Sequence, residues 1–390
     1  MTTSPPRTKL LFYIPGLLDG GAERLWACLA SELHARGYNV VFAQDFEAAD
    51  NRNNLHPAIP VHTVGRSHVS GVRALARLLA AERPDVTLSA VAGSNLKLML
   101  ARTLSRSNAA PILTYHGFEE WRTGMASFAT FASLPALSRS AARVVAVSDG
   151  LRDTLVTRWG SRASNTIAIH NPVYVPPTAP VPTLEQISAR PPVILAAGRL
   201  SAEKDFTTLI RAFARLDRTD AKLTILGKGP ERENLTAEIA RLGLGGRVEL
   251  AGYTAEPWQY YETARLFVCS SRSESFGNTV VEAMAHGLSI VSTACGGPTE
   301  ILQRGSHGRL TPVGDEIALA IAIDAALTNP SDPASQRQRA GDFSFAERVP
   351  VYERLIADVL TERTQGCAGN SQIKLSAKPP THSGQARCTP

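Results

Sequence analysis

The sequence predicts an α/β protein with two doubly wound, Rossmann-like domains that face a cleft. Three observations predict this fold class. Short apolar runs alternate with segments of helical periodicity along most of the 390 residues, as in parallel sheets covered by helices. The length and the 44% hydrophobic content suffice for two cores. A proline-rich stretch near the middle separates two series of these units.

The first domain is predicted to span residues 1–173. Its predicted strands are 9–14, 38–43, 84–89, 111–115, 143–147 and 166–169, and its predicted helices are 22–36, 70–82, 95–105 and 149–158. Residues 121–143 carry apolar side chains three or four apart, from Trp121 to Leu137, which predicts one further helix with an apolar face. We favour packing of that face on the sheet, with contact to a lipid surface as the alternative.

A linker is predicted at residues 174–192, where prolines recur. The second domain, residues 193–345, has predicted strands at 193–197, 223–226, 248–252, 266–269 and 288–292. Its predicted helices are 206–216, 257–263, 276–286 and 315–327, and a further helix is predicted to start in the small-residue loop 296–300. A last helix, 346–364, is expected to cross back to the first domain, with Pro350 in its first turn or at a kink. Residues 365–390 have few large apolar side chains and predict a disordered tail.

The composition limits the cellular compartment and the kinds of binding partner that we expect. Apolar runs are too short for a transmembrane helix, the N-terminus lacks a signal-peptide core, and the five cysteines are scattered, so we expect a cytoplasmic protein. The net charge of +6 lies in residues 1–175, which hold 18 basic and 12 acidic residues. This excess fits an anionic membrane surface or a phosphate-bearing acceptor, or equally solvated helix faces. No nucleic-acid recognition motif is present.

The stretch 270–300 carries the strongest pattern for chemistry. It places Glu274 and Glu282 around a predicted loop and helix start that contains Gly277. Free N–H groups and the positive dipole end at such a start bind phosphate, and carboxylates beside it suit sugar hydroxyls. The alternative is an ordinary strand–helix unit with two solvated glutamates.

Loops after other predicted strands supply cations, glycines and a histidine. Arg199 and Lys204 follow the first strand of the second domain and could stabilise a leaving diphosphate. Gly20 and Gly21 follow the first strand of the chain, where a tight turn is the alternative to a ligand loop; the loop is not G-x-G-x-x-G. His116 ends another strand, and a lone histidine there is more often structural.

These segments resemble one family. The sequences G-G-A-E-R from residue 20, G-R-L-S-A-E-K-D from residue 198, and E-S-F-G-N-T-V-V-E-A-M-A-H-G from residue 274 with G-G-P-T-E after it resemble the retaining GT-B glycosyltransferases of family 4. The resemblance covers about residues 8–362. Ser289 stands where the family often has proline, a position that looks structural.

The resemblance implies transfer of a sugar from a nucleoside diphosphate sugar to a glycan or lipid-linked acceptor with retention, in cell-surface polysaccharide or glycolipid synthesis. The donor would be a UDP-sugar, with GDP as the alternative. His116, Arg199, Lys204 and Glu274 would be catalytic. The donor would be bound by Gly20, Gly21, Gly198, Gly229, Tyr253, Phe276, Gly277, Asn278, Thr279 and Glu282. No Asp-x-Asp is present, so no metal or other cofactor is expected.

Three alternatives stay open. A sugar-nucleotide epimerase would share the fold and donor but need no acceptor. A phosphorylase-like enzyme would need a lysine-bound pyridoxal phosphate, for which no supporting motif stands out. A non-catalytic binding protein would not need both cations and both glutamates, all of which are present.

Overall fold

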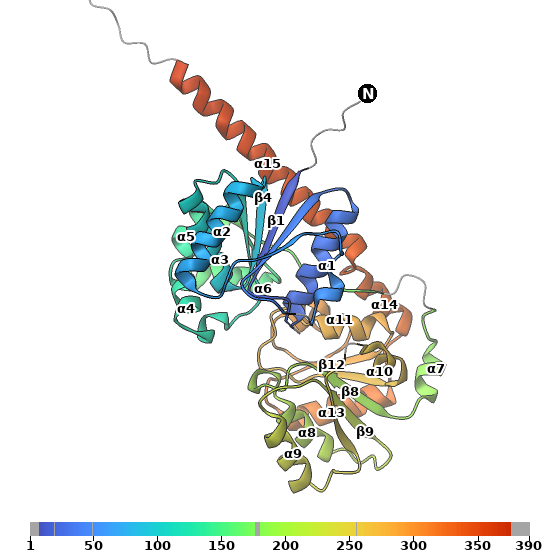
Figure 1. The fold of residues 1–390 in the computed structure, drawn as a ribbon. Helices are drawn as coiled ribbons and strands as arrows, with labels where there is room; N and C mark the ends of the chain where they lie inside the picture. Colours follow the sequence, from blue (N-terminus) through green and yellow to red (C-terminus); the bar gives the residue numbers. More distant parts are fainter. Residues whose placement is uncertain (1–7, 19, 49, 176–179, 255, 376–390) are drawn as a thin grey trace, which may run out of the picture.

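Two parallel sheets, one in each half of the chain, organise the protein (Figure 1). The computed structural model describes residues 8–18, 20–48, 50–175, 180–254 and 256–375. The prediction of two doubly wound α/β domains is confirmed.

The first sheet has the strand order β3-β2-β1-β4-β5-β6-β7. Its strands are β1 (Lys9–Ile14), β2 (Asn39–Gln44), β3 (Val61–Thr63), β4 (Val86–Ala90), β5 (Ala110–Tyr115), β6 (Arg143–Ala146) and β7 (Thr166–Ala168). Successive side chains of a strand enter opposite cores, as Phe12 and Tyr13 of β1 do. The sequence pattern does not predict β3, because its three residues are too few to show a period.

Helices cover both faces of this sheet (Figure 1). They are α1 (Gly21–Ala35), α2 (His68–Glu82), α3 (Ala92–Ser105), α4 (Met125–Ala132), α5 (Leu134–Ser140) and α6 (Asp149–Thr157). The single helix predicted over 121–143 is wrong. A 3-10 turn, η2 (Glu120–Thr123), precedes α4, and the chain breaks again at Ser133, where Pro135 opens α5. Proline favours a first helical turn over a helix interior, which accounts for the break.

The second sheet has the order β10-β9-β8-β11-β12-β13. Its strands are β8 (Val193–Ala197), β9 (Lys222–Leu226), β10 (Val248–Gly252), β11 (Leu266–Cys269), β12 (Ser289–Thr293) and β13 (Arg309–Thr311). The helices of this half are α7 (Leu184–Ala189), α8 (Phe206–Ala214), α9 (Arg232–Arg241), α10 (Trp258–Thr263), α11 (Asn278–Ala285), α12 (Gly297–Ile301), α13 (Glu316–Thr328) and α14 (Pro333–Gly341).

Three of these helices are absent from the predicted set. Helix α7 lies inside the predicted linker, so that stretch is not uniformly extended. Thr183 and Gln186 form a capping box at its start, a sequence signal that the surrounding prolines obscure. Helix α14 begins at Asp332-Pro333, and the Asp332 side chain accepts a hydrogen bond from Ser335 N. Helix α9 has an apolar face of only Leu235 and Ile239, which is a weak pattern.

The last helix, α15 (Phe345–Leu375), returns to the first domain and packs beside α1 (Figure 1). Tyr352 and Ile356 enter the core with Trp26 of α1, and Arg36 pairs with Glu353 at 2.9 Å. Pro350 lies inside the helix, in its second turn. The helix continues past residue 364, where the tail is predicted to begin; residues 376–390 lie outside the described part of the chain.

Both sheets reverse their strand order at one point, between β1 and β4 in the first and between β8 and β11 in the second. Open parallel sheets bind ligands outside the carboxyl ends of the strands at such reversal points. A ligand site is therefore expected at the loops that leave β1, β4, β8 and β11.

Candidate active site

One cleft of about 1800 Å³ lies between the two domains and is lined by residues of both. It is bounded by the loops after β1 and β5 on one side and after β8, β9 and β11 on the other. All fourteen predicted site residues line it. The structure therefore brings the predicted set together, although their individual roles stay predictions.

The N-terminus of α11 opens into this cleft. Gly277 precedes the helix with φ 104° and ψ 58°, a left-handed conformation that favours glycine. The first helical hydrogen bond runs from Val280 N to Gly277 O, at 3.0 Å. The N–H groups of Asn278 and Thr279 therefore have no partner within the helix and, with the helix dipole, can receive an anion.

Lys204 and Glu274 form an ion pair across the cleft floor. Lys204 ends the short turn after β8, whereas Glu274 follows β11 and is held by its N–H, which donates to Cys295 O at 3.0 Å. Burial alone would lower the pKa of Lys204, but the Glu274 carboxylate raises it above its ordinary value, so Lys204 stays charged. Arg199, in the same loop after β8, adds an exposed cation to the lining of the cleft. This pairing of cation and carboxylate is not apparent from the sequence.

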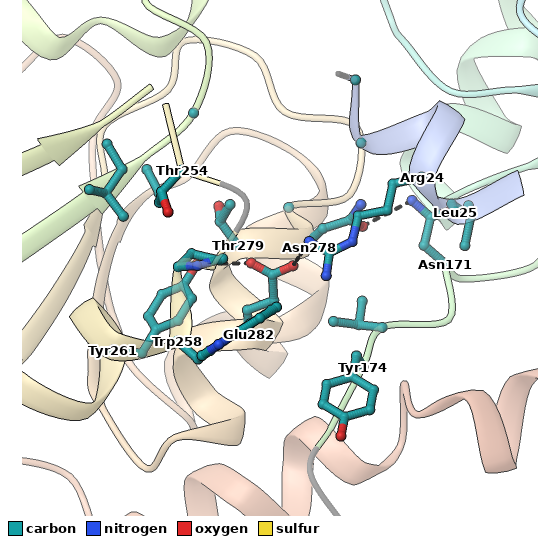
Figure 2. A pocket seen from close by; sticks show the side chains of 18 of the residues that line it. Arg24, Leu25, Asn171, Tyr174, Thr254, Trp258, Tyr261, Asn278, Thr279 and Glu282 are labelled. Carbon is teal, nitrogen blue, oxygen red and sulfur yellow. Dashed lines mark hydrogen bonds and ion pairs between the residues drawn. The ribbon is translucent and has the colours of Figure 1, made fainter. Parts of the chain in front are cut away.

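Glu282 is held between Tyr261 and Arg24, as Figure 2 shows. The Tyr261 hydroxyl donates to Glu282 Oε2 at 2.9 Å, and Arg24 Nη1 lies 4.0 Å from Oε1. Burial raises the pKa of Glu282, and the Arg24 charge and the Tyr261 hydrogen bond oppose that rise. Arg24 also lies 6.0 Å from the ring centroid of Trp258. Tyr261 and Trp258 carry no sequence signal, whereas Arg24 belongs to the G-G-A-E-R motif.

His116 faces this charged wall from the first domain. Burial lowers the pKa of its imidazole to about 4, so the ring is neutral at neutral pH. Its Nε2 has no hydrogen-bond partner among the described residues. The backbone N–H of His116 donates to Glu120 Oε1 at 2.8 Å. A neutral ring nitrogen at the cleft can hydrogen-bond a ligand hydroxyl as donor or acceptor.

Two of the predicted donor-binding aromatic residues differ in placement. Phe276 is 2% exposed, and its ring packs on His170 and Phe343 at centroid distances of 5.7 and 5.4 Å. Its ring therefore stabilises the structure beside the cleft, and its part in donor binding stays a prediction. Tyr253 is 49% exposed at the rim, where Lys228 Nζ lies 5.0 Å from its ring centroid.

Hydrogen bonds join the two domains around the cleft. Phe118 N donates to Ser275 Oγ at 3.0 Å, and Asn171 Nδ2 donates to Asn278 Oδ1 at 3.1 Å. Glu300 of α12 accepts from the N–H groups of Asp149 and Gly150, at 3.0 and 2.7 Å, and so caps α6 of the other domain. These partners lie more than 100 residues apart in sequence.

One group among the described residues could hold a metal ion. Oxygen or nitrogen atoms of Asp149, His170 and Glu300 lie within 4.8 Å of one another. Both Glu300 oxygens already accept backbone hydrogen bonds, and Oε2 lies 3.2 Å from His170 Nε2. These contacts favour a hydrogen-bonded link between domains. The expectation that no metal is required stays a prediction.

Comparison with known proteins relates both halves of the chain to glycosyltransferases. Residues 19–175 match the family described as Glycosyltransferase Family 4, and residues 184–343 match the family described as Glycosyl transferases group 1. The chain is 34% identical over 171 residues to "Lipopolysaccharide core biosynthesis glycosyltransferase LpsE" of Rhizobium meliloti. The aligned segment covers 43% of this chain and 50% of that protein.

A second relative comes from Campylobacter jejuni. The "N-acetylgalactosamine-N,N'-diacetylbacillosaminyl-diphospho-undecaprenol 4-alpha-N-acetylgalactosaminyltransferase" is 37% identical over 134 residues, covering 34% of this chain and 36% of that protein. The matched part of the chain thus spans half or less of the length of these two curated relatives.

The fold is also found among solved structures. The Anabaena protein Alr3699/HepE, solved in complex with UDP, superposes with a TM-score of 0.75 over 92% of this chain and 100% of that one, at 21% identity. That degree of identity supports the fold, which is GT-B. Since the two family matches lie one on each domain and together span most of the residues, the chain belongs to the group 1 glycosyl transferases, family 4.

Proposed function

We propose that this protein transfers a sugar from a nucleoside diphosphate sugar, with UDP as the nucleotide, to a hydroxyl of a glycan or lipid-linked acceptor, with retention of anomeric configuration. The observation that carries the proposal is the arrangement of Lys204, Arg199 and the α11 N-terminus around Glu274, opposite the neutral ring of His116. Positive groups there match a diphosphate, and carboxylates match sugar and ribose hydroxyls.

Each group has a part in the proposed transfer. The diphosphate lies against the N–H groups of Asn278 and Thr279, with Arg199 and Lys204 stabilising the charge that grows on it. Glu282 accepts from the ribose, and Glu274 and His116 hydrogen-bond the donor sugar. The bond from the anomeric carbon to the phosphate oxygen breaks, the acceptor oxygen bonds to that carbon, and the acceptor proton passes to the departing diphosphate.

The choice of UDP and of the acceptor class rests on relatives. A protein of the same fold was solved with UDP, and relatives are named for lipopolysaccharide core synthesis and for a diphospho-undecaprenol acceptor. We therefore place the acceptor among cell-surface glycans or their lipid-linked precursors, with the protein acting in the cytoplasm.

We also propose that the first domain touches an anionic membrane. Met125 and Phe128 of α4 are 90% and 53% exposed, and Leu100 and Leu104 of the adjoining α3 are 51% and 58% exposed. Buried Phe131 and Leu134 show that another face of this segment packs inward, as we favour from sequence. Among the described residues, no helix combines the length and apolar character that crossing a bilayer requires.

Vesicle sedimentation tests the membrane contact. The protein should bind vesicles that contain phosphatidylglycerol at low salt, and Met125→Ser with Phe128→Ser should weaken that binding severalfold. Equal recovery with neutral and anionic vesicles would exclude it.

Thermal shift against UDP, GDP, ADP and dTDP and their sugars tests the donor. Ligands that bind only the folded state raise the melting temperature, so UDP compounds should do so and the others should not. Glu282→Ala should weaken the shift, and Glu249→Ala, an exposed glutamate of β10, should not. No shift with any nucleotide would overturn the proposal.

Two further measurements separate the alternatives. A UDP-sugar incubated with the protein alone should release UDP slowly; conversion to an isomer instead would indicate an epimerase. Activity should persist in EDTA, and a complete loss that magnesium or manganese restores would contradict the expectation of no metal.

A further inference from the structure

The carboxylate of Glu120 joins the ends of two neighbouring strands beneath the first domain's side of the cleft. Glu120 opens the turn η2. Its Oε1 accepts from His116 N at 2.8 Å, at the end of β5, and its Oε2 accepts from Ala92 N at 2.9 Å, just after β4. Each oxygen therefore holds a different loop of the sheet edge.

The backbone around this carboxylate is constrained. Val91, between β4 and α3, has φ 74° and ψ 137°, a conformation that a β-branched residue rarely adopts. Such strain persists only where the surroundings enforce it. A Cβ at Gly117 would lie 2.9 Å from Glu120 Cγ, so a side chain there would displace the carboxylate.

The residue held most directly is His116. Its ring lines the cleft and packs on Trp26, at a centroid distance of 6.2 Å, while its Nε2 has no partner among the described residues. Glu120 is not among the residues that line the cleft. Glu120 can therefore act on a bound ligand through the loops whose backbone it holds, and among the residues it holds, His116 lines the cleft.

We propose that Glu120 is a positioning residue of the proposed transfer: by accepting from the backbone N–H groups of His116 and Ala92, it aims the His116 imidazole at the donor sugar. This rests on the proposed function. The role needs two acceptor oxygens. A glutamine offers one oxygen and one NH2 group, so its amide nitrogen would face a backbone N–H, and one of the two loops would be released.

The test compares Glu120→Gln with Glu119→Gln, the adjacent glutamate that pairs with Arg122 at the surface. Calorimetry measures Kd for UDP, and UDP release from UDP-glucose and UDP-galactose measures turnover. We expect Glu120→Gln to reduce kcat at least tenfold with the Kd for UDP changed less than twofold. Glu119→Gln should match the wild type in both.

A double-mutant cycle with His116→Ala tests the route through His116. If Glu120 acts through that ring, Glu120→Gln should cost less than threefold in kcat when His116 is already alanine. A full tenfold cost in both backgrounds would overturn the proposal, because it would indicate a structural effect. Should Glu120→Gln not fold, Glu120→Asp keeps both oxygens on a shorter stem and should show the same dependence on His116.

The outcomes distinguish this inference from the function on which it rests. A wild-type protein that neither binds UDP nor releases it from a UDP-sugar would overturn both. An active wild type in which Glu120→Gln equals Glu119→Gln would overturn the positioning role alone.

Discussion

The two walls of the cleft are built from the same topological feature and differ in the charged groups that they present. At the β8–β11 reversal the second domain presents Arg199, Lys204, Glu274 and Glu282. At the β1–β4 side the first domain presents a glycine loop and the neutral ring of His116, and its charged lining residues are Arg24, Glu32 and Asp50. One wall is thus suited to bind a charged ligand strongly, and the other to shape the space beside it.

This difference has an energetic consequence. On the second domain Lys204 is already paired with Glu274. Removing one partner leaves the other charge buried without compensation, which costs more than losing a neutral hydrogen bond. Substitutions on the second domain should therefore have larger effects than those on the first.

The largest effect should follow Lys204→Ala. It removes the cation nearest the proposed leaving group and leaves the Glu274 carboxylate without its partner. Loss of one such electrostatic contact lowers kcat by about 10²–10³-fold. UDP release from a UDP-sugar measures it, with Lys222→Ala, at the exposed start of β9, as the control. A loss below tenfold would remove Lys204 from the proposed mechanism.

On the first domain, the expected signature is a pH dependence of stability. The pKa of His116 is about 4 in the folded protein, below the ordinary value near 6.5. As the pH falls, His116 therefore takes up a proton in the unfolded chain before it does so in the folded protein. The free energy of unfolding, which is fully present above pH 6.5, decreases as the pH falls toward 4. The loss is at most about 3 kcal/mol.

Chemical denaturation at pH 7.5 and pH 4.5 measures this dependence. His116→Asn should show a smaller difference between the two pH values than the wild type, and the half-exposed His62→Asn should not. Identical pH profiles for wild type and His116→Asn would mean that His116 is not buried in its neutral form.

The sequence predicts those parts of the cleft whose residues lie close together in the chain, and misses contacts between residues far apart in it. The charged wall is predicted well, because Gly198 to Lys204 and Glu274 to Glu282 are short segments that follow recognisable strands. The Tyr261–Glu282 contact spans 21 residues, and the pairing of Lys204 with Glu274 spans 70. Such contacts depend on how strands are ordered in the sheet, which local periodicity does not determine.

The first domain is predicted less well for a related reason. Glu120 lies in an irregular turn within the segment expected to lead into one long helix, so its two backbone partners are not foreseeable. By contrast, helices α7 and α14 are predictable from the sequence, because both begin with a capping signal: Thr183 with Gln186 for α7, and Asp332 before Pro333 for α14.

A smaller effect on the charged wall should follow Tyr261→Phe. This change removes only the hydroxyl that donates to Glu282 at 2.9 Å. One hydrogen bond to a charged group contributes about 1.5–3 kcal/mol, so UDP affinity should fall roughly tenfold or more. Calorimetric titration measures it against Tyr260→Phe, the adjacent residue in α10. Unchanged affinity in Tyr261→Phe would indicate that Glu282 does not hold the ribose.

The smallest effect is expected at the junction between the two walls. Glu300 accepts from Asp149 N and Gly150 N, so a residue of the second domain caps helix α6 of the first. Burial would raise the pKa of Glu300, but the hydrogen bonds from His170 and these N–H groups lower it below its ordinary value, so the carboxylate is charged at neutral pH. Loss of a helix cap costs about 1 kcal/mol.

Glu300→Ala should therefore lower the melting temperature by about 2–4 °C, given the size of the domains. Glu249→Ala, at an exposed position of β10 that links no domains, should leave it unchanged. Because the cap forms only when the domains are together, saturating UDP-sugar should restore part of the lost stability if the ligand also holds both walls. An equal deficit with and without ligand would mean that the nucleotide binds the second domain alone, and that the first-domain wall contributes nothing to donor binding.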